Sequence, residues 1–237
     1  METKDKTIVI CTIHQPNYLP YLGFFEKMDG KDVMILYDNT QFEKNGFQNR
    51  NKIRTKDGWI WLTVPVLQKA DQLIRDVQID NRTGWQRKHW MSIQSNYSKA
   101  PYFKDYEAPI RSIYEKFEWS KLSDLNMALI MTIKDLLGIK TKLISSSNII
   151  YDLETKSTDA LIELCKEVDA THYISGAGGE EYLEVDKFEK EGIKVIFQHY
   201  DHPEYKQTYA EFHPYMCILD LLFNHGPNSL NILRGIK

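Results

Sequence analysis

Short apolar runs that alternate with helical segments constrain the fold of this chain most strongly. Residues 8–13 (IVICTI) and residues 33–37 (VMILY) are continuous runs with many β-branched side chains. Runs of this kind are typical of strands that are buried on both faces of a parallel sheet. Residues 22–27 lie between them and have the character of a short helix, so the N-terminal part predicts a βαβ unit.

The same alternation returns in the second half of the chain. Further strands are predicted at residues 59–66, 77–79, 142–146, 173–175 and 194–198. Further helices are predicted at residues 85–97, 106–117, 122–137, 157–168, 185–191 and 215–223. We therefore predict one Rossmann-like three-layer α/β domain over residues 1–237, with a mostly parallel sheet and a mostly helical insertion at about residues 85–137.

The composition excludes several classes of function. The chain has 30 basic and 33 acidic side chains and a net charge of −3, so we expect no nucleic-acid partner. Its three cysteines, Cys11, Cys165 and Cys217, lie far apart in apolar stretches and predict buried free thiols. No signal peptide is visible, and no stretch approaches the roughly 20 apolar residues that a membrane-spanning helix needs. We expect a cytoplasmic protein without a membrane span.

The densest group of unusual polar residues follows the first predicted strand. It comprises His14, Gln15, Asn17, Tyr18 and Tyr21, with Pro16 and Pro20 between them. The carboxyl ends of strands form the edge at which open α/β sheets bind ligands. A turn that only capped the next helix would not need a histidine, two amides and two phenols together. We therefore predict a ligand site here, with His14 as its general base.

A second polar segment consists of Asn49, Arg50, Asn51 and Lys52, which follow a turn that contains Gly46 and precede the strand at residues 59–66. Two cations and two amides within four residues suit a phosphate or a carboxylate, and an arginine can bind such a group through two N–H donors. The alternative is an ordinary solvated turn, and the sequence leaves both interpretations open.

A glycine-rich segment follows the predicted strand at residues 173–175. It contains Ser175, Gly176, Gly178 and Gly179, and glycines allow backbone N–H groups to approach a phosphate closely. It lacks the Lys-Ser/Thr ending of a P-loop, and a tight strand-to-helix turn is the simpler interpretation. Because this turn and the His14 turn both follow parallel strands, we expect them to face one crevice, together with the basic segment at residues 49–52.

Two further groups of polar residues lie near the C-terminus. Asp220 and Asn224 are four residues apart, so they share one face of the last predicted helix. The neighbours of Asp220 are apolar, which indicates a buried carboxylate that anchors the fold or orients His14 or Arg50. His199 and His202 have the spacing of zinc ligands, but no third ligand has diagnostic spacing. We therefore predict no metal site there.

Four blocks, in order along the chain, resemble the WbqC-like family. They are residues 14–28, 49–53, 173–179 and 205–226, and the last one adds Tyr205 and Gln207 to the expected substrate-binding residues. Tyr21 and Cys217 stand where we expect Trp and Ser to be commoner. The family is associated with gene clusters for O-antigen and other surface polysaccharides, so the resemblance implies a glycan setting more than a reaction.

Three functions fit these observations. The first is a transferase that attaches an acyl or aminoacyl group to an amino sugar of a sugar nucleotide. Arg50 and the glycine turn would hold its diphosphate, Asn17 and Asn51 would orient hydroxyls, and Tyr18 and Tyr21 would stack on a ring. The second is a nucleotidylyltransferase-like ligase that uses ATP with Mg²⁺, although the second histidine of its HxGH motif is missing. The third is a non-catalytic sugar-nucleotide-binding accessory protein. No resident cofactor is predicted, and the sequence leaves the oligomeric state open.

Overall fold

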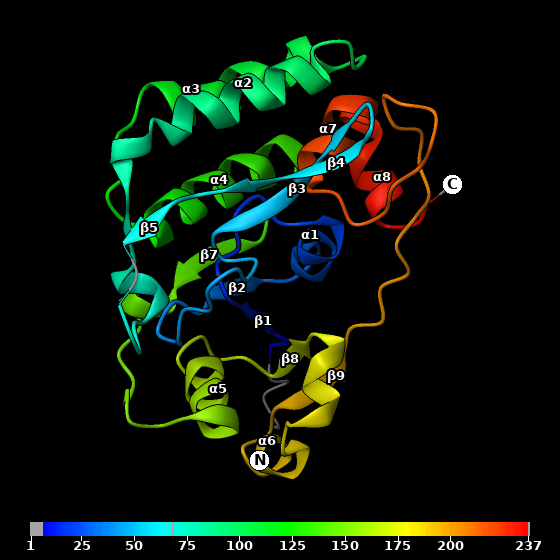
Figure 1. Cartoon of the computed structure of the whole chain (residues 1–237). Coiled ribbons are helices and arrows are strands. Elements are labelled where there is room, and N and C mark those ends of the chain that lie inside the picture. Colours follow the sequence, from blue (N-terminus) through cyan, green and yellow to red (C-terminus); the bar gives the residue numbers. More distant parts are fainter. Residues whose placement is uncertain (1–6, 68, 237) are drawn as a thin grey trace. The chain divides into compact units, whose positions relative to one another are not determined.

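A five-stranded parallel sheet organises the first part of the fold (Figure 1). The computed structural model describes residues 7–67 and 69–236. The sheet has the order β7-β2-β1-β8-β9, and every neighbouring pair is parallel. Its strands are β1 (Ile10–His14), β2 (Val33–Leu36), β7 (Lys142–Ser145), β8 (His172–Ser175) and β9 (Lys194–Phe197). This mostly parallel sheet with its helices confirms the predicted Rossmann-like three-layer α/β class.

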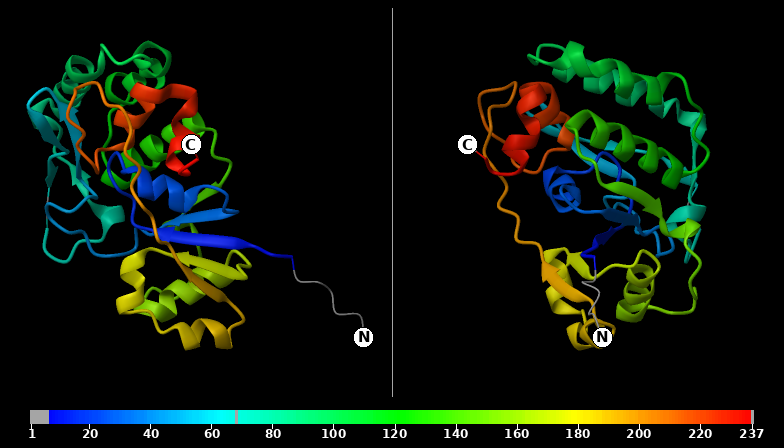
Figure 2. Two further views of the ribbon diagram at one scale, coloured as in Figure 1. Left: turned by 90° about the vertical axis from the view of Figure 1, so that its right-hand side faces the viewer. Right: turned by 180° about the vertical axis from the view of Figure 1, so that it is seen from behind.

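The chain divides into two compact units, which the sequence analysis did not distinguish. The first comprises the described residues up to His14, together with Lys27–Tyr37 and Lys140–His199. It contains the five-stranded sheet and the helices α5 (Ser157–Lys166) and α6 (Val185–Lys190). The two helices pack against each other, and α6 packs on β9 (Figure 2).

The core of the first unit is formed by the apolar runs that predicted its strands. Cys11 and Ile13 of β1 pack in one buried cluster with side chains of β2, α5 and α6. The ring of Tyr173 in β8 stacks on that of Phe188 in α6, with the centroids 5.2 Å apart. All three cysteines are buried free thiols, as predicted.

The second unit comprises Gln15–Glu26, Asp38–Ile139 and the described residues from Tyr200 onward. Its helices are most of α1 (Leu22–Met28), and α2 (Trp85–Tyr97), α3 (Phe103–Glu115), α4 (Leu122–Leu137), α7 (Ile218–His225) and α8 (Ser229–Leu233). Its strands are β3 (Arg50–Thr55), β4 (Gly58–Thr63), β5 (Val66–Leu67) and β6 (Gln78–Ile79). Short 3₁₀ helices occupy Ile74–Asp76, Asn81–Thr83, Ser146–Asn148, Ala177–Glu181 and Gly226–Asn228 of the two units.

Local sequence rules account for the helices α2 and α4. In α2 the side chains of Trp90, Ile93 and Tyr97 are buried on one face, as their spacing of three and four residues predicts. The helix α4 ends where Gly138 adopts a φ of 78°, a left-handed conformation that a glycine reaches without steric cost. Within the described part of the chain, every helix is too short or too polar to cross a membrane.

The segment at residues 49–52 is the main difference from the predicted elements. It begins the strand β3, which pairs antiparallel with β4 from Arg50 opposite Thr63 to Thr55 opposite Gly58. The sequence predicts no strand over these residues and leaves an ordinary solvated turn open as one interpretation. The pairing with β4 shows that Arg50, Asn51 and Lys52 are extended, so the interpretation as a solvated turn does not hold for them.

Candidate functional site

The first unit brings two of the predicted segments to neighbouring strand ends. In the pair β1–β8, Cys11 lies opposite Tyr173 and Thr12 opposite Ile174. His14 ends β1 and Ser175 ends β8, so both lie at the carboxyl edge of the parallel sheet. This is the edge at which open α/β sheets bind ligands.

The glycine turn after β8 is open on one side and tightly packed on the other. A Cβ atom placed on Gly178 would have no described heavy atom within 4 Å, whereas one on Gly179 would lie 2.1 Å from Ser175 Oγ. Gly179 is therefore needed for packing, and the buried Ser175 hydroxyl donates to the Gly176 carbonyl at 3.1 Å. The backbone at Gly178 is left open to a ligand.

A buried lysine stands beside this turn. Lys27 of α1 is 3% exposed, and its Nζ donates to the carbonyl of Ile13 at 3.0 Å. The same nitrogen lies 3.9 Å from the position that a Cβ on Gly176 would occupy. It thus lies between the end of β1 and the start of the glycine turn. Burial lowers the pKa of Lys27 to about 7, so this amine exchanges a proton near neutral pH.

The sequence analysis did not single out Lys27. The signal that would have found it is its position in α1 (LGFFEKM), where the neighbouring Phe24, Phe25 and Met28 are all buried. A lysine in such a setting usually extends its amine to solvent along an apolar surface. Only the packing around α1 shows that the amine stays inside.

In the second unit, the amides around the Gln15–Tyr21 segment hold the backbone in place. Asn51 Nδ2 donates to the carbonyl of Leu19 at 2.7 Å, and Leu19 has a φ of 44°, which is unusual for a side chain of this kind. Gln48 Nε2 donates to Gln15 Oε1 at 2.7 Å. Asn17 is buried as well. The amide of Asn51, which we expected to orient a substrate hydroxyl, is in this conformation bonded to the main chain.

The two tyrosines of this segment have different surroundings. Tyr18 is fully buried, and its hydroxyl lies 2.8 Å from His89 Nδ1 and 2.6 Å from the Tyr114 hydroxyl. Its ring therefore belongs to the core rather than to a surface on which a ligand can stack. Tyr21 is partly exposed, and its ring centroid lies 6.5 Å from that of Tyr215. Burial raises the pKa of the Tyr21 phenol, so it stays a neutral donor at physiological pH.

The hairpin β3–β4 carries cations and indoles on one face. The residues of this face, Arg50, Lys52, Trp59 and Trp61, alternate along the two strands with residues that face inward. The Arg50 Cζ atom lies 4.3 Å from the centroid of the Trp61 ring. Lys52 Nζ lies 4.9 Å from that of Trp59, and the two indole centroids are 5.7 Å apart. These are cation–π distances. Asn49 instead ties down the end of the hairpin, because its Nδ2 donates to the Val64 carbonyl at 3.0 Å.

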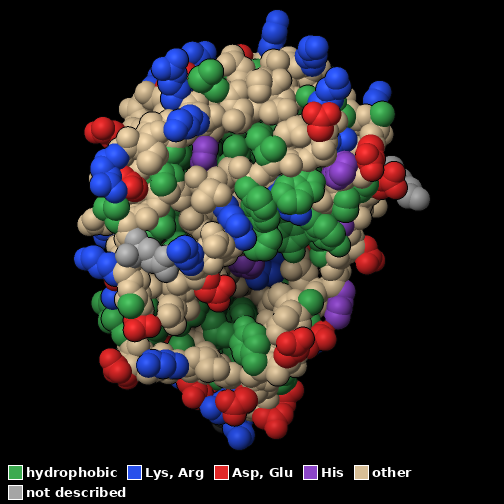
Figure 3. All heavy atoms as spheres, in the orientation of Figure 1, with side chains coloured by type: hydrophobic (Ala, Val, Ile, Leu, Met, Phe, Trp, Pro, Cys, Tyr) green, Lys and Arg blue, Asp and Glu red, His purple; other side chains and the backbone are tan. Residues whose placement is uncertain are grey.

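Part of this aromatic face is open to solvent. Trp59 is 43% exposed, and Phe47, whose ring centroid lies 6.1 Å from that of Trp61, is 53% exposed. Figure 3 shows hydrophobic side chains gathered over the hairpin with a basic side chain beside them. Arg50 Nε is buried and has no hydrogen-bond partner among the described residues. The sequence analysis named Arg50 and Lys52 but not the two indoles, which only the β3–β4 register places beside them.

Asp220 is the centre of a buried polar network in the same unit. Its Oδ2 accepts hydrogen bonds from the Tyr205 hydroxyl at 2.9 Å and from Gln207 Nε2 at 2.8 Å. Burial raises the pKa of this carboxyl to about 6. The buried Arg54 donates from Nε to Gln207 Oε1 at 3.3 Å and from Nη2 to the Glu211 carbonyl at 2.7 Å. These contacts are those of a carboxylate that anchors the C-terminal segment.

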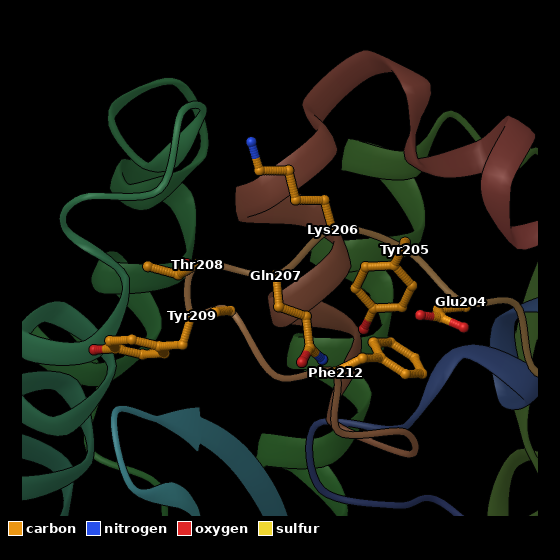
Figure 4. Close-up of a pocket in the computed structure, with 8 residues that line it drawn as sticks. Glu204, Tyr205, Lys206, Gln207, Thr208, Tyr209 and Phe212 are labelled. Carbon is orange, nitrogen blue, oxygen red and sulfur yellow. The ribbon is translucent and has the colours of Figure 1, made fainter.

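Two cavities flank this C-terminal segment. The first, of about 540 Å³, contains Tyr205 and Gln207 and is shown in Figure 4. Its lining residues are Glu204, Tyr205, Lys206, Gln207, Thr208, Tyr209, Ala210 and Phe212. The second, of about 460 Å³, is lined by Asn224 together with residues of α2, of the β3–β4 turn and of the C-terminal segment. The Asn224 amide is oriented by its own helix, because Nδ2 donates to the Asp220 carbonyl at 2.7 Å.

The histidines after β9 have partners of their own. The Nδ1 of His202 lies 2.9 Å from the Pro203 carbonyl, and its Nε2 accepts from the Tyr215 amide at 3.2 Å. Burial lowers the pKa of His202. His199 Nε2 lies 3.4 Å from Glu180 Oε1. Within residues 7–67 and 69–236, no three His, Cys, Asp or Glu side chains are grouped so that they could hold a metal ion.

The predicted site residues therefore fall into two sets. His14, Ser175 and the glycines lie with Lys27 in the first unit, and the remaining ones lie in the second. That the basic segment at residues 49–52 shares one crevice with the strand ends stays a prediction.

The fold and these strand ends define an α/β protein with a histidine, a buried lysine and a glycine turn at the carboxyl edge of its parallel sheet. Comparison with known proteins is more specific. The model of the WbqC-like protein family matches residues 15–232, and the chain belongs to this family, which confirms the resemblance of the four sequence blocks.

The chain is also similar to a relative from Mycobacterium tuberculosis (strain ATCC 25618 / H37Rv), the uncharacterized protein Rv1507c. The two are 38% identical over 225 residues, which cover 94% of this chain and 96% of the relative. No solved structure matches the chain significantly. Membership of the WbqC-like family suggests a role associated with polysaccharides of the O-antigen type.

Proposed function

We propose that the protein is an enzyme of surface-polysaccharide biosynthesis that transfers an acyl or aminoacyl group to the amine of an amino sugar carried by a sugar nucleotide. The observation that carries this proposal is the position of Lys27. Its buried amine lies between the end of β1, which His14 completes, and the glycine turn after β8. A cation, a potential base and an open backbone turn thus stand together at the ligand-binding edge of a parallel sheet.

The diphosphate of a sugar nucleotide suits this edge. The space beside Gly178 lets a phosphate approach the backbone of the glycine turn, and the Lys27 ammonium supplies the opposite charge. A nearby phosphate favours the charged form of a lysine, so binding would raise the pKa of Lys27 from about 7 and keep the amine protonated. Burial would strengthen this attraction, because water screens it less inside the protein.

The hairpin of the second unit, taken by itself, has a face that suits the ring of a sugar or of a nucleobase. The exposed face of Trp59 suits the apolar face of a sugar or a nucleobase, because both are flat and pack closely on an indole. Arg50 and Lys52 flank the indoles and suit an anionic substituent.

The transfer itself requires one proton acceptor. The amine nitrogen of the sugar attacks the carbonyl carbon of an activated acyl donor, such as a thioester or an acyl phosphate. A new C–N bond forms, the bond between the carbonyl carbon and the leaving group breaks, and the leaving group departs with the bonding electrons. His14 takes the proton that the amine nitrogen loses, which is the task of a general base.

A second candidate is an amide ligase that activates the acyl group with ATP. The layout favours it in one respect, because a histidine ends one parallel strand and a glycine turn follows the adjacent strand. Enzymes of the nucleotidylyltransferase type use a second histidine in the first turn. In this chain the next histidine after His14 is His89, whose ring is buried in the second unit.

The test combines ligand binding with turnover. Thermal stabilisation is measured with uridine- and thymidine-diphosphate amino sugars, and separately with ATP and Mg²⁺. Acyl transfer is followed as the mass gained by the amino sugar. We expect stabilisation by a sugar nucleotide without ATP, and loss of turnover by about 10²–10⁴-fold in His14→Ala, with binding retained.

The matched control is His199→Ala, which removes an exposed histidine of the same unit. If His14→Ala turns over like His199→Ala, the assignment of the base is wrong. Stabilisation by ATP with Mg²⁺ alone would favour the ligase. If a sugar nucleotide binds but no activated acyl donor modifies it, the remaining interpretation is a non-catalytic sugar-nucleotide-binding accessory protein.

A further inference from the structure

The cavity of about 460 Å³ in the second unit is lined by three lysines from separate segments. Lys56 lies in the β3–β4 turn, Lys99 follows α2, and Lys206 belongs to the C-terminal segment. The other lining residues are uncharged: Ser95, Asn96, Ala100, Pro101, Gln207, Thr208, Tyr209 and Asn224. The cavity is thus cationic although the whole chain has a net charge of −3.

The three ammonium groups have no carboxylate partner among the described residues. None of them forms an ion pair with a carboxylate in the part of the chain that the structure describes. All three lysines are exposed, and like charges around one hollow repel each other. A bound anion would remove this repulsion, whereas an empty cavity has only solvent ions to reduce it.

The uncharged wall adds fixed hydrogen-bonding groups and one ring. The Thr208 hydroxyl donates to Asn224 Oδ1 at 3.0 Å, which fixes the orientation of both side chains. The Tyr209 ring has the buried Arg54 guanidinium 5.3 Å from its centroid. In Figure 4, Thr208 and Tyr209 point away from the rings of Tyr205 and Phe212. The two cavities share Lys206, Gln207, Thr208 and Tyr209, whereas Tyr205 and Phe212 line the first cavity and the residues of α2 line the second.

We propose that this cavity binds the diphosphate group of a small phosphorylated molecule. Its volume lies within the range of about 300–1,000 Å³ that small-molecule sites occupy. The three positive charges of the lysines match the two to three negative charges of a diphosphate. A ligand with a single carboxylate would leave two of the three lysines uncompensated. The Tyr209 ring suits a nucleobase attached to the diphosphate. The inference does not depend on the acyl transfer proposed above, because it concerns a cavity of the other unit.

The site is tested with inorganic pyrophosphate as the probe, by isothermal titration calorimetry at low and at physiological salt. One variant combines Lys56→Gln, Lys99→Gln and Lys206→Gln. The matched control combines Lys88→Gln and Lys104→Gln with Lys116→Gln, which removes three exposed lysines of the same unit that do not line the cavity. Both variants change the net charge equally, so a difference between them reports position rather than total charge.

We expect the cavity variant to bind pyrophosphate about tenfold or more weakly than the control variant, because three contacts between charges are lost. Equal affinity of the two variants, or no saturable binding by the wild type, would overturn the proposal. Lys99→Glu is a second variant, for the case that the triple variant folds poorly. It reverses one charge of the cavity, so it should also bind pyrophosphate more weakly than the wild type.

A Lys27→Met variant separates this proposal from the proposed function. If pyrophosphate binding is lost in Lys27→Met and unchanged in the cavity variant, the anion binds at the strand ends and the cavity proposal fails alone. The reverse pattern supports the cavity. Binding of ADP and of UDP is then compared to identify the source of the diphosphate. Tighter binding of ADP indicates an adenylate-based donor, and tighter binding of UDP indicates the sugar nucleotide.

Discussion

Replacing Lys27 by Met should make the protein more stable while it weakens anion binding. The substitution removes the amine but keeps a flexible side chain of similar length in the buried position. The wild-type amine has one described hydrogen bond, to the Ile13 carbonyl. It is otherwise an ionisable group that burial makes costly to charge.

The size of the effect follows from the pKa of Lys27, which burial lowers from 10.5 to about 7. At about 1.36 kcal/mol per pKa unit, this difference corresponds to a destabilisation of the folded protein by about 5 kcal/mol below pH 7. In this range Lys27 is charged in both the folded and the unfolded state. At pH 7 the folded state is half deprotonated, and about 4 kcal/mol remain. The lost hydrogen bond offsets about 1 kcal/mol. We therefore expect Lys27→Met to be more stable by about 3 kcal/mol at pH 7.

The sign of the pH dependence is set by the two pKa values. Between pH 7 and pH 10.5 the unfolded chain binds more protons at Lys27 than the folded protein does. The free energy of unfolding of the wild type therefore rises with pH in this window. From pH 7 to pH 9 the rise due to this residue should be about 2 kcal/mol, so the advantage of Lys27→Met shrinks to about 1 kcal/mol.

Urea unfolding of both proteins at pH 7 and pH 9 measures these differences, because all other groups titrate alike in the two proteins. A Lys27→Met variant that is less stable than the wild type at pH 7, or whose difference from it does not change with pH, would refute the burial argument. Pyrophosphate binding by the same two proteins shows separately whether the amine contacts an anion.

Other predictions concern single contacts. Gly178→Ala should leave the melting temperature unchanged and weaken phosphate binding in calorimetry, whereas Gly179→Ala should cost about 1–3 kcal/mol in urea because its Cβ meets Ser175 Oγ. Tyr18→Phe should destabilise by about 1–3 kcal/mol in the same assay, because a buried histidine and a buried phenol lose their partner. Burial lowers the pKa of His89 to about 4, so the unfolded chain binds more protons between pH 4 and pH 6.5. Stability should fall by about 3 kcal/mol as the pH drops through this window, and His89→Leu should flatten that part of the urea–pH profile.

The sheet could be predicted from the sequence because each of its strands carries its own signal. A continuous apolar run such as IVICTI favours burial on both faces, which the structure shows for Cys11, Thr12 and Ile13, although Ile8 is exposed. The connecting helices set the parallel direction. The strand β3 has no such signal. Its sequence RNKIRT has a cation at every second position, and Arg54, which is buried, breaks the alternation of buried and exposed side chains that a strand shows. Only its pairing with β4 shows that it is a strand.

The candidate site could be predicted in part. His14 and the glycine turn were found because topology alone places the ends of parallel strands at one edge. The roles of single polar side chains could not be read in the same way. An amide that binds a ligand and one that holds a backbone carbonyl have the same sequence signature. Asn51 donates to the Leu19 carbonyl, and the positive φ of Leu19 that creates this need is invisible before the fold is known.

The distribution of charge in the structure argues for discrete anion sites rather than for a surface that binds a polyanion. Lys27 is buried at the strand ends, Arg50 and Lys52 lie against indoles, and the three cavity lysines surround one hollow. Because the net charge is −3, acidic residues elsewhere on the surface more than balance these cations. A long polyanion would meet both signs and gain little, whereas a small phosphorylated molecule meets only the local positive potential. On this ground the substrates that we propose are small phosphorylated molecules, of which sugar nucleotides are one class.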